Sequence, residues 1–126
     1  MSESLQKLEQ NFANLIRAYR KKQIGKGPEK IKVTFTRNWV VAHMSGCLSP
    51  VESFITRSEE GRNMILHART HMIKELYSEL TPTDMEQLVG AKFIKLITDV
   101  DLDKDEVVSI FVFEQPIDGT QDMFSI

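Results

Sequence analysis

Hydrophobic residues recur near the start of the chain at steps of three and four, the spacing of one face of an α-helix. This stripe consists of Leu5, Leu8, Phe12, Leu15 and Tyr19. It predicts a helix over residues 5–19 that packs on a core, and a seam between two copies of the helix is the alternative. Gly25 and Pro28 then predict the end of the helix, because glycine suits the position after a helix and proline cannot continue one.

Two stretches with a strand pattern follow this helix. Apolar and polar residues alternate over residues 31–35, and a second apolar stretch covers residues 39–46. Arg37 and Asn38 separate the stretches and suit a tight turn, because Asn tolerates a positive φ. The pattern therefore predicts a β-hairpin.

The middle of the chain repeats the capping-box spacing, in which a Ser or Thr precedes an acidic residue by three positions. The pairs are Ser49 with Glu52 and Thr56 with Glu59. They predict a short helix near residues 49–57 and a longer one to about residue 80. The apolar stripe of the longer helix is expected to consist of Ile65, Ala68, Met72, Ile73, Leu76 and Leu80.

A third helix start and a second hairpin complete the pattern. A Thr-Pro pair at residues 81–82 marks the start of a helix, and Gly90 marks its end. Apolar stretches at 92–100 and 106–114 then flank an acidic turn and predict two more strands.

This order, α-β-β-α-α-α-β-β, predicts an α+β fold with a four-stranded antiparallel sheet made of two hairpins and helices packed on one face. A chain of 126 residues with 41% hydrophobic residues suits one domain. We expect a single domain over residues 1–126, with an ordered core at about 5–114 and a flexible tail at 116–126.

The last strand is apolar on both faces, whereas an antiparallel sheet with one solvated face alternates. One face carries Val108, Ile110 and Val112, and the other carries Val107, Phe111 and Phe113. Strand 92–100 is expected to place Phe93 and Ile97 on one face and Ile94 and Leu96 on the other. We therefore expect the second face of the sheet to be covered, either by a homodimer partner or by a helix of the same chain.

Charge is distributed unevenly along the chain. The net charge of −2 argues against nucleic acid as a partner. Residues 1–32 hold eight Lys or Arg and three acidic residues, whereas residues 99–126 hold eight acidic residues and Lys104 alone. Such asymmetry attracts one end to the other, within a chain or between subunits.

The sequence also predicts where the protein works. Its N-terminus lacks the basic and apolar regions of a signal peptide, and no apolar run reaches the roughly 20 residues of a membrane span. A single cysteine, Cys47, fits a reducing compartment and is expected to be a small buried hydrophobe. We expect a cytoplasmic protein without direct membrane insertion.

Candidate catalytic chemistry is sparse. His67 and His71 are four residues apart, as in metal-ligand pairs on helices, but Ala68 stands where the metalloprotease motif needs a glutamate. His43 is a third candidate ligand. We expect no cofactor and no catalytic residues, and a metal-dependent enzyme using His67 and His71 is one alternative.

Several motifs in this order resemble the MpsC-like family, named for a sodium-translocating, membrane-potential-generating system. They are the Gly-Lys-Gly-Pro turn at 25–28, Val-Val at 40–41 leading to Gly46, Leu-Ser-Pro-Val-Glu at 48–52, Glu-Glu-Gly-Arg at 59–62, Gly90 with Asp99, and the apolar strand end at 110–113. The resemblance covers residues 5–114. It implies a small cytoplasmic accessory protein, linked to a membrane system for ions or inorganic carbon, and no catalytic residues.

The family motifs also supply candidate residues for binding a ligand or partner. They are Gly25, Gly27, Pro28, Thr56, Glu59, Gly61 and Arg62. A glycine inside a helix costs about 1 kcal/mol relative to alanine, so Gly61 suggests close approach of a partner or ligand. Arg62 suits a bidentate anion clamp, assisted by helix-start N–H groups near Thr56.

Two functions therefore stand beside the enzyme alternative. The first is a dimeric, non-catalytic accessory or regulatory module that binds a protein of a membrane system. The second is a small-anion sensor that uses Arg62 and helix N-termini.

Overall fold

The computed structural model describes residues 2–79 and 83–119. Its elements follow the predicted order: α1 (Ser2–Ile24), β1 (Lys30–Thr36), β2 (Trp39–Ser45), α2 (Pro50–Ile55), α3 (Glu59–Glu79), α4 (Thr83–Val89), β3 (Phe93–Asp101) and β4 (Glu106–Phe113). The first helix is longer than its apolar stripe predicted. It begins at Ser2 and ends in a basic last turn, where cations complement the helix dipole.

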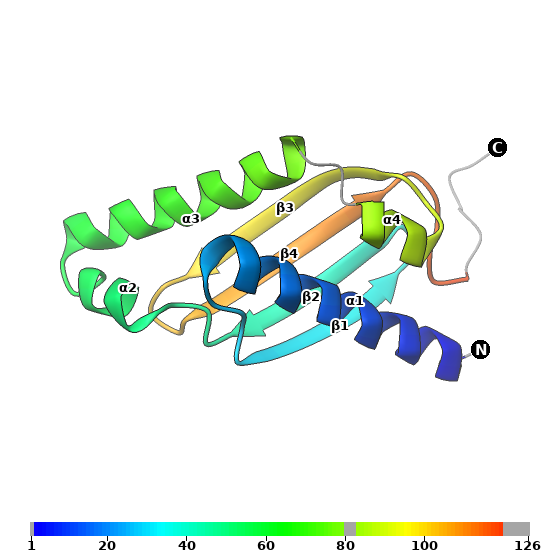
Figure 1. The fold of residues 1–126 in the computed structure, drawn as a ribbon, viewed down its shortest axis with the longest axis horizontal. Coiled ribbons are helices and arrows are strands. Elements are labelled where there is room, and N and C mark those ends of the chain that lie inside the picture. The colour runs from blue at the N-terminus through cyan, green and yellow to red at the C-terminus, as the bar shows by residue number, and fades with distance from the viewer. Residues whose placement is uncertain (1, 80–82, 120–126) are drawn as a thin grey trace.

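The four strands form one antiparallel sheet in the order β1-β2-β4-β3. The two hairpins therefore meet through the central pair β2 and β4. Figure 1 shows α1, α3 and α4 lying across the same face of the sheet. The predicted α+β architecture, with helices on one face, is confirmed.

The core lies between α1 and this inner face of the sheet. Phe12 of α1 is fully buried, and its ring makes edge contacts with three sheet residues. The ring centroids lie 5.9 Å from Phe35, 5.2 Å from Phe111 and 6.3 Å from Phe113. The apolar stripe of the first helix is thus used for packing within the chain.

Several predicted turns and caps are confirmed. Gly25 and Gly90 have positive φ values of 94° and 75° and follow the ends of α1 and α4. The capping box of α2 is present, with the Ser49 N–H donating to Glu52 and the Glu52 N–H donating to the Ser49 hydroxyl. In the hairpin turn, Arg37 rather than Asn38 has the positive φ, 59°.

The second predicted capping box, Thr56 with Glu59, is wrong. Thr56 ends α2, since its N–H donates to the Glu52 carbonyl and its hydroxyl donates to the Ser53 carbonyl. Ser58 takes the capping role for α3 and accepts the N–H of Gly61 at 2.9 Å. The cap predicted at Thr81 lies outside the described residues.

A β-bulge changes which residues of β3 face the core. The register shifts between Phe93 and Lys95, so Ile94 is an extra residue and is exposed. Phe93 therefore packs against the core together with Leu96, while Ile97 lies on the other face. The prediction that Phe93 and Ile97 share a face is wrong, because it assumed unbroken alternation.

The buried face of α3 also differs from the predicted stripe. Its buried residues include Gly61, Ile65, Arg69, Ile73 and Tyr77, whereas Ala68 and Met72 are exposed. Leu80 and the side chain of Leu76 lie outside what the structure describes. The shift matters because it turns Arg69, a charged residue, toward the core.

Part of the expected flexible tail is held by the β1–β2 turn. Ile117 is buried, and its N–H donates to the Arg37 carbonyl at 2.7 Å. The Asp118 carboxylate accepts the N–H of Arg37. Residues 120–126 of that tail lie outside the described residues.

No helix within residues 2–79 and 83–119 combines the length and the apolarity that crossing a bilayer requires.

Candidate functional site

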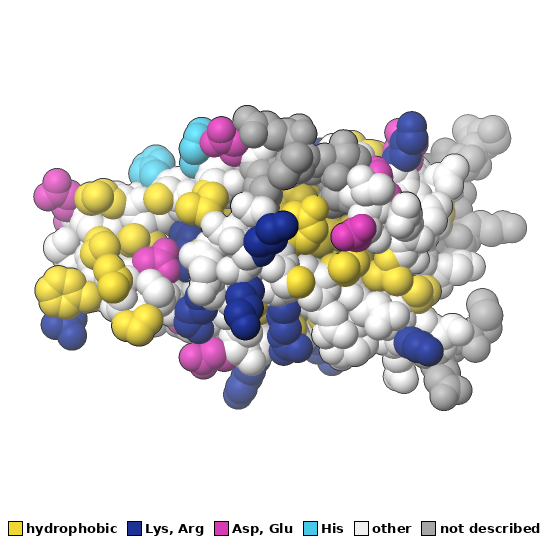
Figure 2. Space-filling model, viewed as in Figure 1, with side chains coloured by type: hydrophobic (Ala, Val, Ile, Leu, Met, Phe, Trp, Pro, Cys, Tyr) yellow, Lys and Arg dark blue, Asp and Glu magenta, His cyan; other side chains and the backbone are white. Residues whose placement is uncertain are grey.

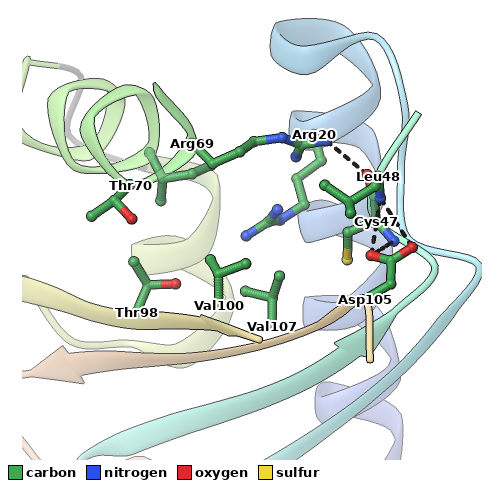
Figure 3. Close-up of a pocket in the computed structure, with 10 residues that line it drawn as sticks. Arg20, Cys47, Leu48, Arg69, Thr70, Thr98, Val100, Asp105 and Val107 are labelled. Carbon is green, nitrogen blue, oxygen red and sulfur yellow. Dashed lines mark hydrogen bonds between the residues drawn. The ribbon is translucent and has the colours of Figure 1, made fainter. Parts of the chain in front are cut away.

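A small cavity lies where α1 and α3 meet the sheet, beside the loop that leaves β2 (Figure 3). Its volume is about 10 Å³, which is room for roughly one water-sized sphere. Its polar lining comes from five separate parts of the chain: Arg20, Cys47, Arg69, Thr70, Thr98 and Asp105. We call it the Arg20 cavity.

Arg69 crosses one side of the cavity and has two partners there, Glu52 and the Cys47 carbonyl. Its side chain is 6% exposed and forms a two-pronged pair with Glu52, with both N···O distances at 2.6 Å. The same guanidinium donates to the Cys47 carbonyl at 2.7 Å. Arg69 thereby ties α2 and the loop after β2 to α3.

The partner of Arg69, Glu52, is strongly stabilised as a carboxylate. Hydrogen bonds from Arg69 lower the pKa of Glu52 to about 2, with a further contribution from the backbone N–H of Ser49, against an opposing effect of burial. One carboxylate therefore serves both as the helix cap and as the counter-charge of a buried arginine.

Asp105 fixes the loop on the opposite side of the cavity. Its carboxylate accepts the N–H groups of Cys47 at 2.9 Å and Leu48 at 3.1 Å, and its carbonyl accepts the N–H of Gly46 at 3.0 Å. Asp105 itself has a positive φ of 51°, which aspartate tolerates better than most residues. The acidic turn between β3 and β4 thus has a structural task.

Cys47 is buried at this point, and burial raises the pKa of its thiol. A protonated thiol is a poor nucleophile. The side chain therefore behaves as the small hydrophobe that was expected.

Arg20 enters the cavity from the last turns of α1. Its residue is 6% exposed, and Figure 3 shows the guanidinium pointing into the space between Arg69 and Thr98. Within the described part of the chain, no hydrogen bond or ion pair reaches this guanidinium. Burial lowers the pKa of Arg20, but arginine remains charged at physiological pH.

The structure places the predicted anion clamp, Arg62, against an acidic hairpin. Its guanidinium pairs with Asp103 at 2.9 Å and is 37% exposed. The shallow hollow beside it is also lined by Asp99 and Asp101. Arg62 thus already has a carboxylate partner from the chain itself.

Gly61 allows close approach, but to the chain's own α2. A Cβ at this position would lie 1.9 Å from the Ile55 carbonyl oxygen, far inside van der Waals contact. Thr56 caps the C-terminus of α2 at the same junction, and Glu59 is exposed in the first turn of α3. These three predicted residues therefore shape the turn from α2 into α3.

The predicted residues near the end of α1 form a separate group. Gly27 packs closely on the helix, since a Cβ there would lie 3.4 Å from the Arg17 carbonyl oxygen. Pro28 is buried, and between the two glycines Lys26 donates to the Gly46 carbonyl at 2.8 Å. This loop therefore braces the segment that leads to Cys47.

The three histidines are not brought together. His67 and His71 lie on the exposed side of α3, where His71 faces Glu75 at 3.0 Å. His43 lies on the outer face of the sheet, 3.7 Å from Glu106. Across residues 2–79 and 83–119, no group of three potential metal-ligating side chains occurs.

The face of the sheet away from the helices is apolar at its centre. Directly paired residues share a face, so Val41, Ile110 and Ile97 form a row across three strands. Trp39, Ile97 and Val108 are 48%, 49% and 39% exposed. We call the set Trp39, Val41, Ile97, Val108 and Ile110 the outer sheet face.

The margins of the outer sheet face carry opposite charges. Lys30 and Lys32 lie on the β1 edge, and Asp99 and Asp101 lie on the β3 edge. The register places Lys32 and Asp99 in one row across the sheet, and Lys30 and Asp101 in another. The uneven charge of the sequence therefore places basic residues along the β1 edge of the sheet and acidic residues along the opposite β3 edge.

The opposite side of the molecule has its own apolar patch. Val51, Phe54 and Met64 are 68%, 64% and 61% exposed. Figure 2 shows hydrophobic side chains gathered over α2 and the beginning of α3. Arg57 stacks on the Phe54 ring at 5.1 Å and partly covers this patch.

Comparison with known proteins identifies the family. The family described as "Na+-translocating membrane potential-generating system (MpsC)" matches residues 4–115. The chain belongs to the MpsC family. It is 46% identical over 107 residues to the uncharacterized protein YrhF of Bacillus subtilis, which covers 85% of this chain and 88% of YrhF.

A second Bacillus subtilis protein is more distantly similar. The uncharacterized protein YbcI is 23% identical over 111 residues, covering 88% of this chain and 89% of YbcI. No solved structure matches the chain. The matched residues of the MpsC family extend across the Arg20 cavity and the outer sheet face alike.

Sequence reasoning missed the residues of the Arg20 cavity. Arg20 follows Phe12 and Ile16 at steps of four residues, so the three lie on one face of the first helix. In α3, Arg69 lies at the same spacing between Ile65 and Ile73. A charged residue at a position that continues a buried helix face was the available signal. It is weak, because long cationic side chains commonly leave such faces for solvent.

Proposed function

We propose that this MpsC-family protein is a non-catalytic accessory module of the membrane-potential-generating system for which the family is named, and that it acts as a homodimer. The observation that carries the proposal is the outer sheet face, an apolar surface in a fold whose helices α1, α3 and α4 lie on the other side (Figure 1). Such faces on small proteins mark interaction sites.

Charge favours a second copy of the same chain as the occupant. A twofold axis parallel to the strands lays the β1 edge of one copy over the β3 edge of the other. Because Lys32 and Asp99 lie in one row, that axis sets the lysine of each copy opposite the aspartate of its partner. The apolar centres then pack sheet on sheet, the aligned arrangement common in β-sandwiches.

Sedimentation of the purified protein tests the dimer. We expect the mass of two 14.5 kDa chains, and we expect Ile97→Lys to give monomers because it buries an unpaired charge at the centre of the interface. Met64→Lys is the matched control, since Met64 is at least as exposed but lies on α3. A monomeric wild type, or equal behaviour of both variants, contradicts the proposed dimer.

The opposed edges offer an independent check. Lys32→Glu and Asp99→Lys should each weaken the dimer, since each sets like charges against one another across the interface. The double variant restores opposite charges and should recover affinity. Single variants that dimerise like the wild type would rule out the twofold axis described above.

The link to the membrane system rests on family membership and is tested in cells. Deleting the gene should lower the membrane potential, read with a voltage-sensitive dye, and wild-type protein should restore it. Ile97→Lys should fail to restore it, whereas Met64→Lys should succeed. An unchanged potential in the deletion strain contradicts the role as an accessory of that system.

A further inference from the structure

The Arg20 cavity holds a charge without a counter-charge. The guanidinium of Arg20 belongs to a residue that is 6% exposed, and no described residue hydrogen-bonds to it or pairs with it. Burying a charge is costly unless it is paired, and removing the partner of a buried charge is among the most destabilising changes known. The site therefore lacks a negative counter-charge for Arg20, and no described residue of the chain supplies one.

The neighbouring charges do not fill this role. Glu52 is held by both prongs of Arg69, and Asp105 accepts the N–H groups of Cys47 and Leu48. Figure 3 shows the Asp105 carboxylate directed at that loop and away from the guanidinium of Arg20. Arg69 adds a second positive charge close to the first and disfavours it further.

The remaining lining suits a small anion. Thr70 and Thr98 contribute hydroxyl groups, and the Thr98 hydroxyl lies 3.0 Å from that of Ser109, so one of the two can donate elsewhere. Val100 and Val107 supply part of the apolar lining. With a volume of about 10 Å³, the cavity has space for one atom of roughly the size of water.

We propose that the Arg20 cavity binds one chloride ion, with Arg20 as its counter-charge and the threonine hydroxyls as further donors. The size of the cavity excludes polyatomic anions such as nitrate and sulfate. The anion would join α1, α3 and β3, so its concentration would set how firmly these elements are held together. This proposal is independent of the dimer.

Thermal unfolding at constant ionic strength tests the site, with sodium gluconate replaced stepwise by sodium chloride or, as a polyatomic comparison, by sodium nitrate. An anion at about 100 times its Kd should raise the Tm by roughly 10 °C for a domain of this size. Lys22→Met, an exposed site on the same helix, should keep this increase, and Arg20→Met should lose it. Nitrate should leave the Tm at its value in gluconate, because it is too large for the cavity.

Three results would overturn the proposal: a Tm in chloride equal to that in gluconate, an increase that survives in Arg20→Met, or an equal increase with nitrate. Crystals of the wild type grown in sodium bromide give a reading that does not depend on the variant folding. An anomalous peak beside the Arg20 guanidinium supports the site, and density for water alone refutes it.

Discussion

Replacing Glu52 by glutamine tests the central ion pair of this fold. The carboxylate pairs with Arg69 and caps α2, and its pKa falls from the ordinary 4.5 to about 2. One pKa unit corresponds to about 1.4 kcal/mol, so a shift of this size stabilises the folded state by about 3 kcal/mol at neutral pH. Glu52→Gln should lose about that amount, because it leaves Arg69 buried without a counter-charge.

The pH dependence of this loss follows from the sign of the shift. Below pH 4.5 the unfolded chain protonates Glu52 while the folded chain still holds it ionised. The stabilisation is therefore fully present above about pH 4.5 and is lost as the pH falls toward 2. The difference in unfolding free energy between wild type and Glu52→Gln should be constant from pH 7 to 5 and shrink below that.

Urea denaturation across pH 3 to 7 measures this difference, with Glu60→Gln as the control at an exposed site in α3. The control should change stability by less than about 0.5 kcal/mol. The double variant Glu52→Gln with Arg69→Met should be less destabilised than the sum of its parts, because it removes both charges. A loss below about 1 kcal/mol for Glu52→Gln, or a loss that does not vary with pH, would refute the assignment.

Two further substitutions test the close contacts around the cavity. Gly61→Ala should lower the free energy of unfolding in urea by about 2–4 kcal/mol, because a Cβ there would lie 1.9 Å from the Ile55 carbonyl oxygen. The control Ala68→Gly on the same helix should lower it by only about 1 kcal/mol. Equal losses for the two variants would contradict the predicted steric clash. Asp105→Ala should cost about 2–4 kcal/mol because it leaves the N–H groups of Cys47 and Leu48 without an acceptor. Asp105→Asn keeps an acceptor and tolerates the positive φ, so it should recover most of the stability, and failure to do so would show that the charge itself is required.

Two buried arginines on adjacent helices give this small domain an unusual interior. Arg69 is balanced within the chain by Glu52, whereas Arg20 is not balanced by any residue that the structure describes. Because the two lie close together, the loss of the Glu52 charge would leave two cations facing one cavity. The stability of the Arg69 pair and the occupancy of the Arg20 cavity should therefore be coupled.

Local signals accounted for the order of the elements and for most of their ends. Gly25 and Gly90 were recognised as helix stops, and Ser49 with Glu52 as a capping box, because each signal acts on a backbone group a few residues away. Thr56 failed because Ser58, two residues later, offers the same chemistry in better register with α3. Two equivalent caps this close cannot be ranked without the packing of the helix they begin.

The residues of the candidate site, in contrast, could not be predicted from local signals. Gly61 suggested close approach of a partner or ligand, whereas the group that the structure places against it is the chain's own Ile55. Arg62 suggested an anion clamp by residue type alone, and the fold brings Asp103 to it. The residues with the most unusual environment, Arg20 and Arg69, belong to no local motif.

What the sequence determined by itself is the α-β-β-α-α-α-β-β order and the apolar character of both faces of the last strand. These follow from periodicity and from caps, which depend on neighbours within about four residues. Only the tertiary structure decided which charges meet: Arg69 with Glu52 from 17 positions away, Asp105 with Cys47 from 58, and Arg20 with no described partner at all. Electrostatic pairing depends on distance in space and on exclusion of water, and neither is encoded at any one position of the chain.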